Sequence, residues 1–499
     1  MHSGGMSIAA DFFELILIHL DDNKISQSGS RKVQWDDALC SSILKNNRDV
    51  IDAPGEFVMS RKGQKRHKDY SIRTSMIHND YDSRHWEYNH PLVPPMNVSC
   101  AYRLDSVQRG MQGFAQFASD ENGSEAPIYV YERLDEPTRG ILEEKLALAE
   151  DADIAVCFAT GMAAVSAALC INVTSGDEII AHQLLYGCTY SLLSNWMIRQ
   201  GVSTKFIDLR DMEALAGAIT SKTRVVYFET PVNPTLELLD IRAIKSCVDE
   251  ANKHRKEDER IVLIVDNTFA TPFCQRPISH GADFVVHSLT KNIGGFGTDM
   301  GGVVIGAGRY HRSLLLYRKD FGGTLAARSA WPLLVYGLPT LATRLEQEQR
   351  SAIAIAQFLE NHPLIDHVSY PGLDSFAQSD LAHRQMISYD GRFAPGSMIY
   401  FVLKGSSGEA QAAAAHFIDA IARSSQSITL AVSLGQTRTL IEEPYSMTHS
   451  ALPDAIKDVA ALAPGGIRLS IGLEDVNDII GDLSRALEIT GSKLQAKAL

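Results

Sequence analysis

The feature that most constrains the fold is a series of short apolar runs, separated by helical stretches, between residues 141 and 305. These runs do not alternate polar with apolar residues, which is typical of strands that helices cover on both faces of a mainly parallel sheet. We therefore predict an α/β fold, with helices from Ile141 to Asp151 and from Ala163 onward. Five strands are expected: Ile154 to Ala159, Arg224 to Glu229, Ile261 to Val265, Phe284 to His287 and Gly302 to Ile305.

The rest of the chain divides by composition. Residues 1–73 are predicted to be an irregular extension that contains one amphipathic helix, Ile8 to Leu20, and ends in a basic run at residues 61–68. Residues 74–140 resemble an extended arm, and residues 141–330 form the α/β domain. A smaller α+β domain is expected over residues 331–499, with a strand from Ser397 to Leu403 and an amphipathic helix from Val476 to Ile489.

Charge and cysteine content narrow the possible partners. The net charge of −13 over 499 residues disfavours nucleic acid and anionic membranes, because both require a basic surface. The seven cysteines are scattered and contain no closely spaced pair, so neither a disulfide framework nor a metal site is indicated. The helix Ile8 to Leu20 is too short to span a bilayer. We expect a cytoplasmic protein that acts on a small molecule.

The first candidate site follows the strand Ile154 to Ala159, where Thr160, Gly161 and Met162 lead into an alanine-rich helix. Ligands of open α/β sheets bind at the carboxyl ends of the strands. Free backbone N–H groups at the start of a helix suit a phosphate. A simple tight turn that needs glycine for its geometry is the alternative interpretation.

The next strand ends carry charged and hydroxyl groups. Asp266 follows the strand Ile261 to Val265, although an aspartate there can also cap a helix. Ser288, Thr290 and Lys291 follow the strand Phe284 to His287, although a lysine at a strand end is often only a solvated charge. A phosphate seat, a carboxylate and a lysine on one sheet together match the needs of pyridoxal phosphate: the lysine forms an imine, and the carboxylate keeps the ring nitrogen protonated.

Several ordered motifs between about Thr74 and Ile489 resemble the pyridoxal-phosphate enzymes of cysteine and methionine metabolism. The resemblance implies the aspartate aminotransferase-like fold of type I and a homotetramer, a dimer of dimers with shared active sites. The matching segments are Tyr131-Glu132-Arg133 with Pro137-Thr138, Thr160-Gly161-Met162, Tyr186-Gly187-Cys188-Thr189, Glu229 to Pro234, Val265 to Thr268, His287 to Lys291, Ser433-Leu434-Gly435, Met447 to Ser450 and Ile467 to Ser470.

The same resemblance implies roles for single residues. Lys291 would form the internal imine and move protons, and Asp266 would pair with the ring nitrogen. The pair Tyr131 and Arg133 would come from a neighbouring subunit to the cofactor phosphate. Tyr186 would stack on the ring and protonate the leaving group, for which nearby cations would have to lower its pKa. The remaining implied contacts are Gly161, Met162, Ser288 and Thr290 to the phosphate, Asn233 near the ring hydroxyl, and Ser433 and Arg468 to the substrate α-carboxylate.

Four positions depart from the family pattern. Glu132 and Glu136 stand where serine and asparagine are common, and they would add negative charge beside the phosphate clamp. Phe296 replaces a common histidine in the glycine run, and Tyr336 replaces a common arginine. None of these changes removes a catalytic group.

The substrate is suggested by what the distal site lacks. No cation follows Tyr186 to bind a second carboxylate, and Val432 stands where cystathionine enzymes often have glutamate. Cys188 follows Tyr186 as in methionine γ-lyases, although a cysteine is also a common core residue. These features favour a C–S lyase that eliminates the γ-substituent of L-methionine or a related sulfur amino acid.

Two other classes remain open. The segment from Lys291 to Thr298 resembles the O-acylhomoserine sulfhydrylases, so a γ-replacement transferase, such as one of these or a cystathionine γ-synthase, is the main alternative. A non-catalytic binding scaffold is a remote alternative.

Overall fold

The computed structural model describes residues 70–78, 92–117, 119, 127–450, 457 and 462–498, with side chains described as far as residue 493. The predicted helix Ile8 to Leu20, the basic run and nearly all of the predicted extension lie outside these residues. None of the described helices is both long and apolar enough to cross a lipid bilayer.

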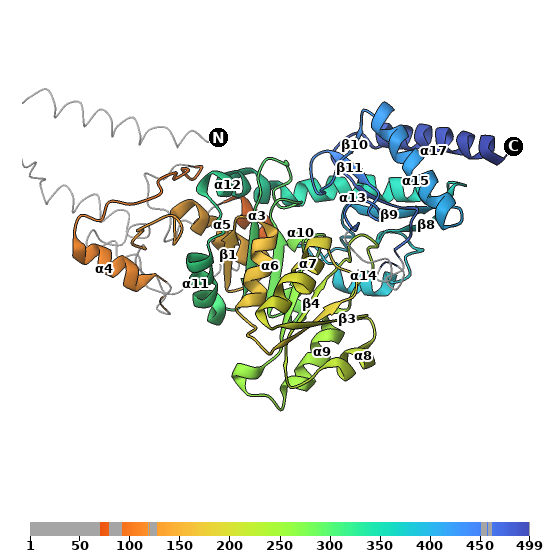
Figure 1. The fold of residues 1–499 in the computed structure, drawn as a ribbon. Coiled ribbons are helices and arrows are strands. Elements are labelled where there is room, and N and C mark those ends of the chain that lie inside the picture. The colour runs from red at the N-terminus through yellow and green to blue at the C-terminus, as the bar shows by residue number, and fades with distance from the viewer. Residues whose placement is uncertain are drawn as a thin grey trace, which may run out of the picture. The chain divides into compact units, whose positions relative to one another are not determined.

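The larger sheet has seven strands in the order β1-β7-β6-β5-β4-β2-β3 (Figure 1). β2 to β6 run parallel, while β7 is antiparallel to both β1 and β6. The α/β prediction is confirmed, and all five predicted strands are present to within one residue at each end. The strands of the larger sheet are β1 Ile154–Phe158, β2 Glu178–His182, β3 Ser203–Ile207, β4 Thr223–Glu229, β5 Val262–Asp266, β6 Phe284–Ser288 and β7 Gly302–Gly306.

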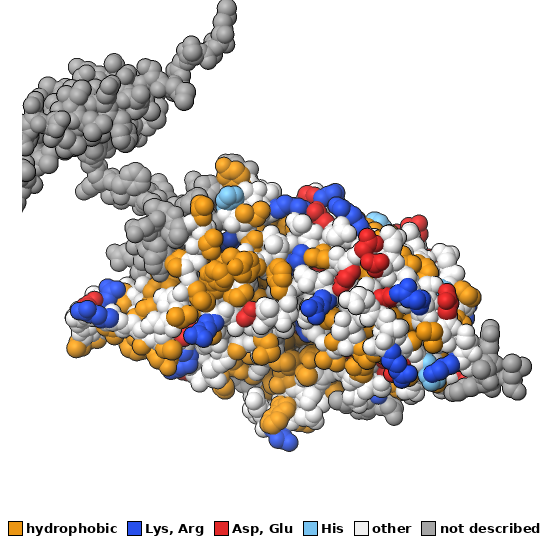
Figure 2. Space-filling view, turned by 90° about the horizontal axis from the view of Figure 1, so that it is seen from above, with side chains coloured by type: hydrophobic (Ala, Val, Ile, Leu, Met, Phe, Trp, Pro, Cys, Tyr) orange, Lys and Arg blue, Asp and Glu red, His pale blue; other side chains and the backbone are white. Residues whose placement is uncertain are grey.

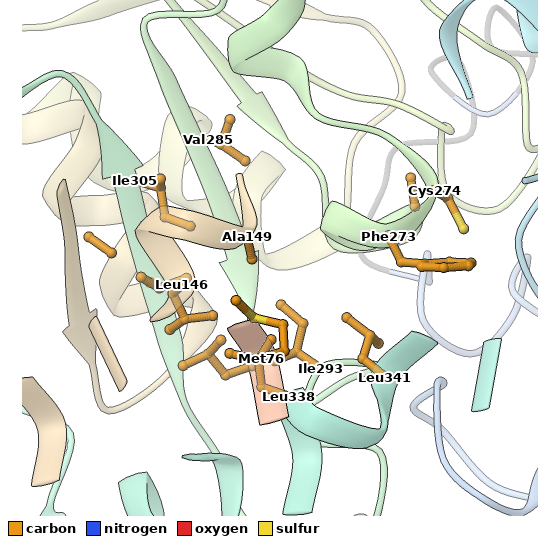
Figure 3. Packing of buried hydrophobic residues seen from close by; sticks show 14 of the residues in the cluster. Met76, Leu146, Ala149, Phe273, Cys274, Val285, Ile293, Ile305, Leu338 and Leu341 are labelled. Carbon is orange, nitrogen blue, oxygen red and sulfur yellow. The ribbon is translucent and has the colours of Figure 1, made fainter. Parts of the chain in front are cut away.

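Apolar side chains cover this sheet on both faces, as the unbroken apolar runs require. Val285 and Ile305 pack with Leu146 and Ala149 of α5 on one face, where Met76 also inserts (Figure 3). Neighbouring strand residues point the other way, into a second cluster with the buried face of α6. β5 and β6 are buried except at their last residues, Asp266 and Ser288, which are partly exposed.

The smaller sheet has five strands in the order β10-β11-β12-β9-β8. All its pairings are antiparallel except that of β10 with β11. α15 and α17 pack beside each other against it, and the long helix α13 runs from the region of α3 to β8 and α17 (Figure 1). Its strands are β8 Ile365–Ser369, β9 Met398–Leu403, β10 Ile428–Leu430, β11 Thr439–Glu442 and β12 Gly466–Ser470.

The helices largely follow the predicted pattern. The helix expected from Ile141 begins at Pro137, because the fixed φ of proline suits the first helical turn and the side chain of Glu136 caps two N–H groups there. The domain boundaries at residues 73, 140 and 330 stay predictions. The α-helices are α3 Ile72–Ile77, α4 Val107–Gln116, α5 Pro137–Ala149, α6 Gly161–Cys170, α7 Gly187–Ser191, α8 Met212–Ala218, α9 Ile241–Asn252, α10 Thr271–Cys274, α11 His311–Phe321, α12 Ala327–Pro332, α13 Leu338–Glu360, α14 Ser379–Gln385, α15 Ser407–Ser424 and α17 Val476–Ala498.

Candidate active site

At the candidate site, the side chain of Lys291, which follows β6, contacts the segment between β10 and β11 of the smaller sheet. It lies three residues beyond the end of β6, and its Nζ donates to the Ser433 hydroxyl at 2.8 Å. Ser433 itself has a φ of +111°, a backbone conformation that serine rarely adopts. The structure thus brings together the residue predicted to carry the cofactor and one predicted to bind the substrate carboxylate.

The surroundings of Lys291 make it a better base than an exposed lysine. Burial and then the positive charge of Arg468 lower its pKa to about 8, against the opposing negative charge of Glu442. A substantial fraction of the amine is therefore neutral near physiological pH. The interpretation of Lys291 as a merely solvated charge does not describe this environment.

Asp266 occupies the last position of β5, next to β6. Its Oδ1 accepts the backbone N–H of Thr268 at 2.9 Å, and the Tyr227 hydroxyl lies 3.4 Å from Oδ2. Burial raises the pKa of the carboxyl, while the hydrogen bonds of Thr268 and the charge of His287 hold it down. A cationic ring nitrogen in front of Asp266 would favour its ionised form.

The start of α6 forms a tight seat against the end of β6. A Cβ on Gly161 would lie 2.9 Å from the Cβ of Ser288, so only glycine allows this approach. Thr160 caps the helix by accepting the N–H of Ala163. The N–H groups at the helix start and the Ser288 hydroxyl therefore gather at one place, as an anion seat requires.

Two other residues predicted at the phosphate lie near this seat with partners of their own. The Thr290 hydroxyl accepts the N–H of Gly301 at 3.1 Å. The Met162 sulfur lies 3.8 Å from the Thr189 hydroxyl of α7. Both side chains are partly exposed, which leaves them accessible to a ligand.

Arg468, predicted to bind the substrate carboxylate, is almost fully buried on β12. Its guanidinium donates to Asn233 Oδ1 at 3.0 Å and to the Ser433 carbonyl at 2.8 Å. It also forms an ion pair of 2.8 Å with Glu442, the residue opposite it on β11. Arg468 thus holds together Asn233, Ser433 and Glu442, three groups from separate parts of the chain.

Sequence reasoning missed Glu442. Its carboxylate is 1% exposed and accepts from the Thr448 hydroxyl at 3.0 Å, yet its Oε2 has no hydrogen-bond partner among the described residues. The pKa of Glu442 is raised by burial against the opposing effect of Arg468. Its place before the matching segment Met447 to Ser450 was the available signal, but its pairing depends on the register of β11 and β12.

Tyr186, Cys188 and Val432 form the exposed rim of the site, since 40% of Tyr186 and 58% of Val432 are exposed. The exposure of Cys188 rules out its interpretation as a core residue. The pKa of Tyr186 is raised, first by burial of its hydroxyl and then by Cys188, Glu229 and Glu442. Within one chain, burial and these acidic neighbours outweigh the cations, so the lowered pKa that the leaving-group role requires is not seen.

The predicted phosphate clamp, Tyr131 and Arg133, does not lie with the other predicted site residues. Tyr131 and Arg133 are both exposed, and the guanidinium lies 5.6 Å from the centre of the Tyr131 ring. The hydrogen bond of the Arg133 side chain goes to the Lys319 carbonyl, not to the seat at Gly161 and Ser288.

The four departures from the family pattern have structural roles. Glu136 caps α5, and Glu132 accepts the N–H of Ala327 at 3.2 Å, so both carboxylates are directed toward their own chain. The pKa of Glu136 is raised to about 7 by burial. Phe296 and Tyr336 both line a cavity of about 430 Å³ beside the glycine run.

These features define a lysine-centred site at the carboxyl end of an α/β sheet, closed by an arginine of a second sheet. The chain belongs to the Cys/Met metabolism PLP-dependent enzymes, whose family model matches residues 73–488. It is a PLP-dependent enzyme of fold type I, as the sequence predicted.

The similarity to known proteins covers most of the chain. The L-methionine gamma-lyase of Pseudomonas deceptionensis is 36% identical over 424 residues, which are 85% of this chain and 98% of the relative. The L-methionine gamma-lyase of Porphyromonas gingivalis is 38% identical over 80% of this chain and 92% of its own. Among solved structures, the cystathionine gamma-lyase of Lactobacillus plantarum complexed with L-serine has a TM-score of 0.72 and 30% identity, covering 85% of this chain and all of that one.

The residues fit pyridoxal phosphate. Gly161 lets the start of α6 lie directly against Ser288, so that the helix N–H groups and the Ser288 hydroxyl can bind the same anion, and Lys291 is a partly neutral amine. Asp266 supplies a carboxylate on the strand beside β6. These are the three groups that the cofactor's phosphate, aldehyde and ring nitrogen require.

Proposed function

We propose that the protein is a C–S lyase that converts L-methionine and water to 2-oxobutanoate, methanethiol and ammonia. The observation that carries the proposal is the Lys291 amine, 2.8 Å from the Ser433 hydroxyl and beside Arg468. An amine that sits against a carboxylate-binding pair can reach the α-carbon of an amino acid held there. The similarity to L-methionine gamma-lyases and the apolar Val432 at the rim support methionine as the substrate.

The residues of the strand ends would hold the cofactor. Lys291 would hold it covalently, and Asp266 would pair with its ring nitrogen. When bound, pyridoxal phosphate supplies a conjugated ring that withdraws electrons from the substrate. Its phosphate would bind Gly161, Met162, Ser288 and Thr290, and Asn233 would lie near its ring hydroxyl.

Separate residues of the chain bind the substrate and transfer its protons. Arg468 and Ser433 bind the α-carboxylate, which fixes the α-hydrogen relative to Lys291. The Lys291 amine takes up the α-proton, gives that proton up again and then takes up a β-proton, and its lowered pKa suits it to this exchange. Tyr186 donates the proton that the departing thiolate needs, and Cys188 lies beside it to contact the thioether.

We propose that the active site is shared between chains of a homotetramer, a dimer of dimers, with Tyr131 and Arg133 donated to the neighbouring site. Support comes from their exposure and from α4, whose Val107, Met111 and Phe114 are between 61% and 82% exposed. Hydrophobic side chains gather in patches on the face shown in Figure 2. A second copy that covers α4 would bury apolar surface and bring a cation toward Tyr186.

We also propose a cytoplasmic location. The six described cysteines are free thiols, and two of them, Cys100 and Cys188, are exposed. Exposed thiols persist in reducing compartments. The thiol content of the protein, freshly purified from whole cells of its source and measured under denaturing conditions, tests this directly, since a disulfide between Cys100 or Cys188 and another residue would argue against it.

A product assay tests the substrate. Purified enzyme given methionine alone should release methanethiol and 2-oxobutanoate in equal amounts. Val432→Glu should lower the ratio of kcat/KM for methionine to kcat/KM for cystathionine about tenfold, because a charge at the rim disfavours an apolar thioether. Val432→Ile is the matched control and should keep the original preference. Methionine left unchanged by active, cofactor-loaded enzyme would contradict the proposal.

A γ-replacement transferase is the second candidate, favoured by the segment from Lys291 to Thr298. Such an enzyme would combine O-acetylhomoserine with sulfide to give homocysteine. Homocysteine formation without 2-oxobutanoate, together with inert methionine, would establish the transferase instead of the lyase.

A further inference from the structure

A chain of five buried polar side chains runs beneath the strands that carry the site. Gln385 of α14 donates to Gln275, which donates to Asn267, and the two distances are 2.9 and 3.0 Å. Asn267 donates to Glu150 Oε1 at 2.9 Å, and His287 Nε2 lies 2.6 Å from the same oxygen. Buried polar groups are costly unless they are hydrogen-bonded, so each of these side chains depends on its neighbour in the network, although Glu150 Oε2 and His287 Nδ1 have no partner among the described residues.

The network adjoins the site through the backbone. Asn267 directly follows Asp266, and His287 directly precedes Ser288. Neighbouring residues of a strand point to opposite faces, so Ser288 faces the site while His287 is fully buried on the other side. The Asn267 N–H also donates to the Val286 carbonyl at 3.0 Å, which joins the ends of β5 and β6 behind the site.

We propose that Glu150 and His287 are positioning residues for the cofactor, which fix the ends of β5 and β6 and keep the Asp266 carboxylate ionised toward the ring nitrogen. The inference rests on the proposed role of Asp266. Neither Glu150 nor His287 touches the site, so both act only through their neighbours.

The charges around Asp266 support this role. Burial raises the pKa of Asp266, and the hydrogen bonds of Thr268 and then the charge of His287 lower it. The other groups that face Asp266 are the Tyr227 hydroxyl and Glu229, whose own pKa is raised by burial and by Asp266. His287 is the one group in this set that can carry a positive charge, and its Nε2 lies 2.6 Å from the Glu150 carboxylate.

The experiment uses the full-length protein with its cofactor removed and then titrated back. Glu150→Gln keeps an oxygen for Asn267 but removes the charge that pairs with His287. The dissociation constant of pyridoxal phosphate should rise about tenfold, the equivalent of one pKa unit at Asp266. The loss of cofactor affinity on acidification should also begin at a higher pH, because a raised carboxyl pKa means that the charge is lost earlier. His287→Gln tests the same charge from the other side if the first variant does not fold.

Gln385→Met is the matched control at the far end of the network. It should lower the melting temperature of the cofactor-free protein while leaving the dissociation constant within about twofold. If Glu150→Gln and His287→Gln behave like this control, the network is structural only and the inference is wrong. If Asp266→Asn also leaves the dissociation constant unchanged, the proposed cofactor site itself fails, which is a separate outcome.

Discussion

The strand-end site and the Tyr131–Arg133 segment differ in how far one chain completes them. At the strand ends, Lys291, Ser433 and Arg468 contact one another or share partners, and Arg468 is 3% exposed. Tyr131 and Arg133 are exposed and make none of these contacts. One chain therefore brings together the residues proposed to hold the cofactor and the substrate carboxylate, but it leaves apart from them the pair proposed to act in a neighbouring subunit.

The largest loss of activity is expected when Lys291 is replaced, because this residue lies at the centre of the strand-end site. Lys291→Ala should lower kcat on the order of 10³-fold, because the base is lost while the other contacts remain. Borohydride reduction of the wild-type enzyme followed by peptide mapping should place the cofactor on Lys291. Lys222→Ala, at an exposed lysine, should keep full activity. A reduced label on another lysine would remove Lys291 from its role.

The buried ion pair of Arg468 and Glu442 is expected to contribute to the stability of the protein as well as to substrate binding. Arg468→Ala should cost about 3–5 kcal/mol of unfolding free energy, because it leaves the Glu442 carboxylate buried without its cation. It should also lower kcat/KM for every substrate with an α-carboxylate. Denaturant unfolding and steady-state kinetics measure the two effects. The exposed Arg438→Ala is the control, and equal losses in both variants would contradict the role of Arg468.

A smaller effect concerns the pH dependence of Lys291. In the cofactor-free protein, its reaction with an amine reagent should rise with pH around a midpoint near 8, since burial and the charge of Arg468 lower its pKa to that value. Because Glu442 raises this pKa, Glu442→Gln should shift the midpoint to lower pH. Glu443→Gln, at the neighbouring buried glutamate, should leave the midpoint unchanged. An upward shift in Glu442→Gln would contradict the electrostatic argument.

The sequence predicted the strand-end site well because its signals are local. Each predicted strand is an unbroken apolar run, and the residue types that follow it identify the chemistry. β2 and β3 of this sheet were missed. β2 has only three apolar residues, Ile179 to Ala181, between Glu178 and His182. β3 begins with the polar residues Ser203, Thr204 and Lys205 and lies at the sheet edge. Glu442 was missed because its contact with Arg468 depends on the pairing of two strands about 25 residues apart in sequence, which no local pattern fixes.

The environment of Tyr186 could not be predicted for a related reason. Folding buries its hydroxyl and places Cys188, Glu229 and Glu442 beside it, and these effects raise its pKa. Which charges meet a side chain depends on packing, and here also on whether a second chain approaches.

Subunit mixing tests the central claim most directly. Lys291→Ala and Arg133→Ala proteins should each be nearly inactive, the second because an unpaired cofactor phosphate costs about 2–5 kcal/mol of binding. Mixed dimers contain one site in which neither group is altered if Arg133 serves the neighbouring chain. Equal mixing should then restore roughly a quarter of wild-type activity, the statistical share of such sites. No recovery in verified mixed oligomers would show that each site is built within one chain.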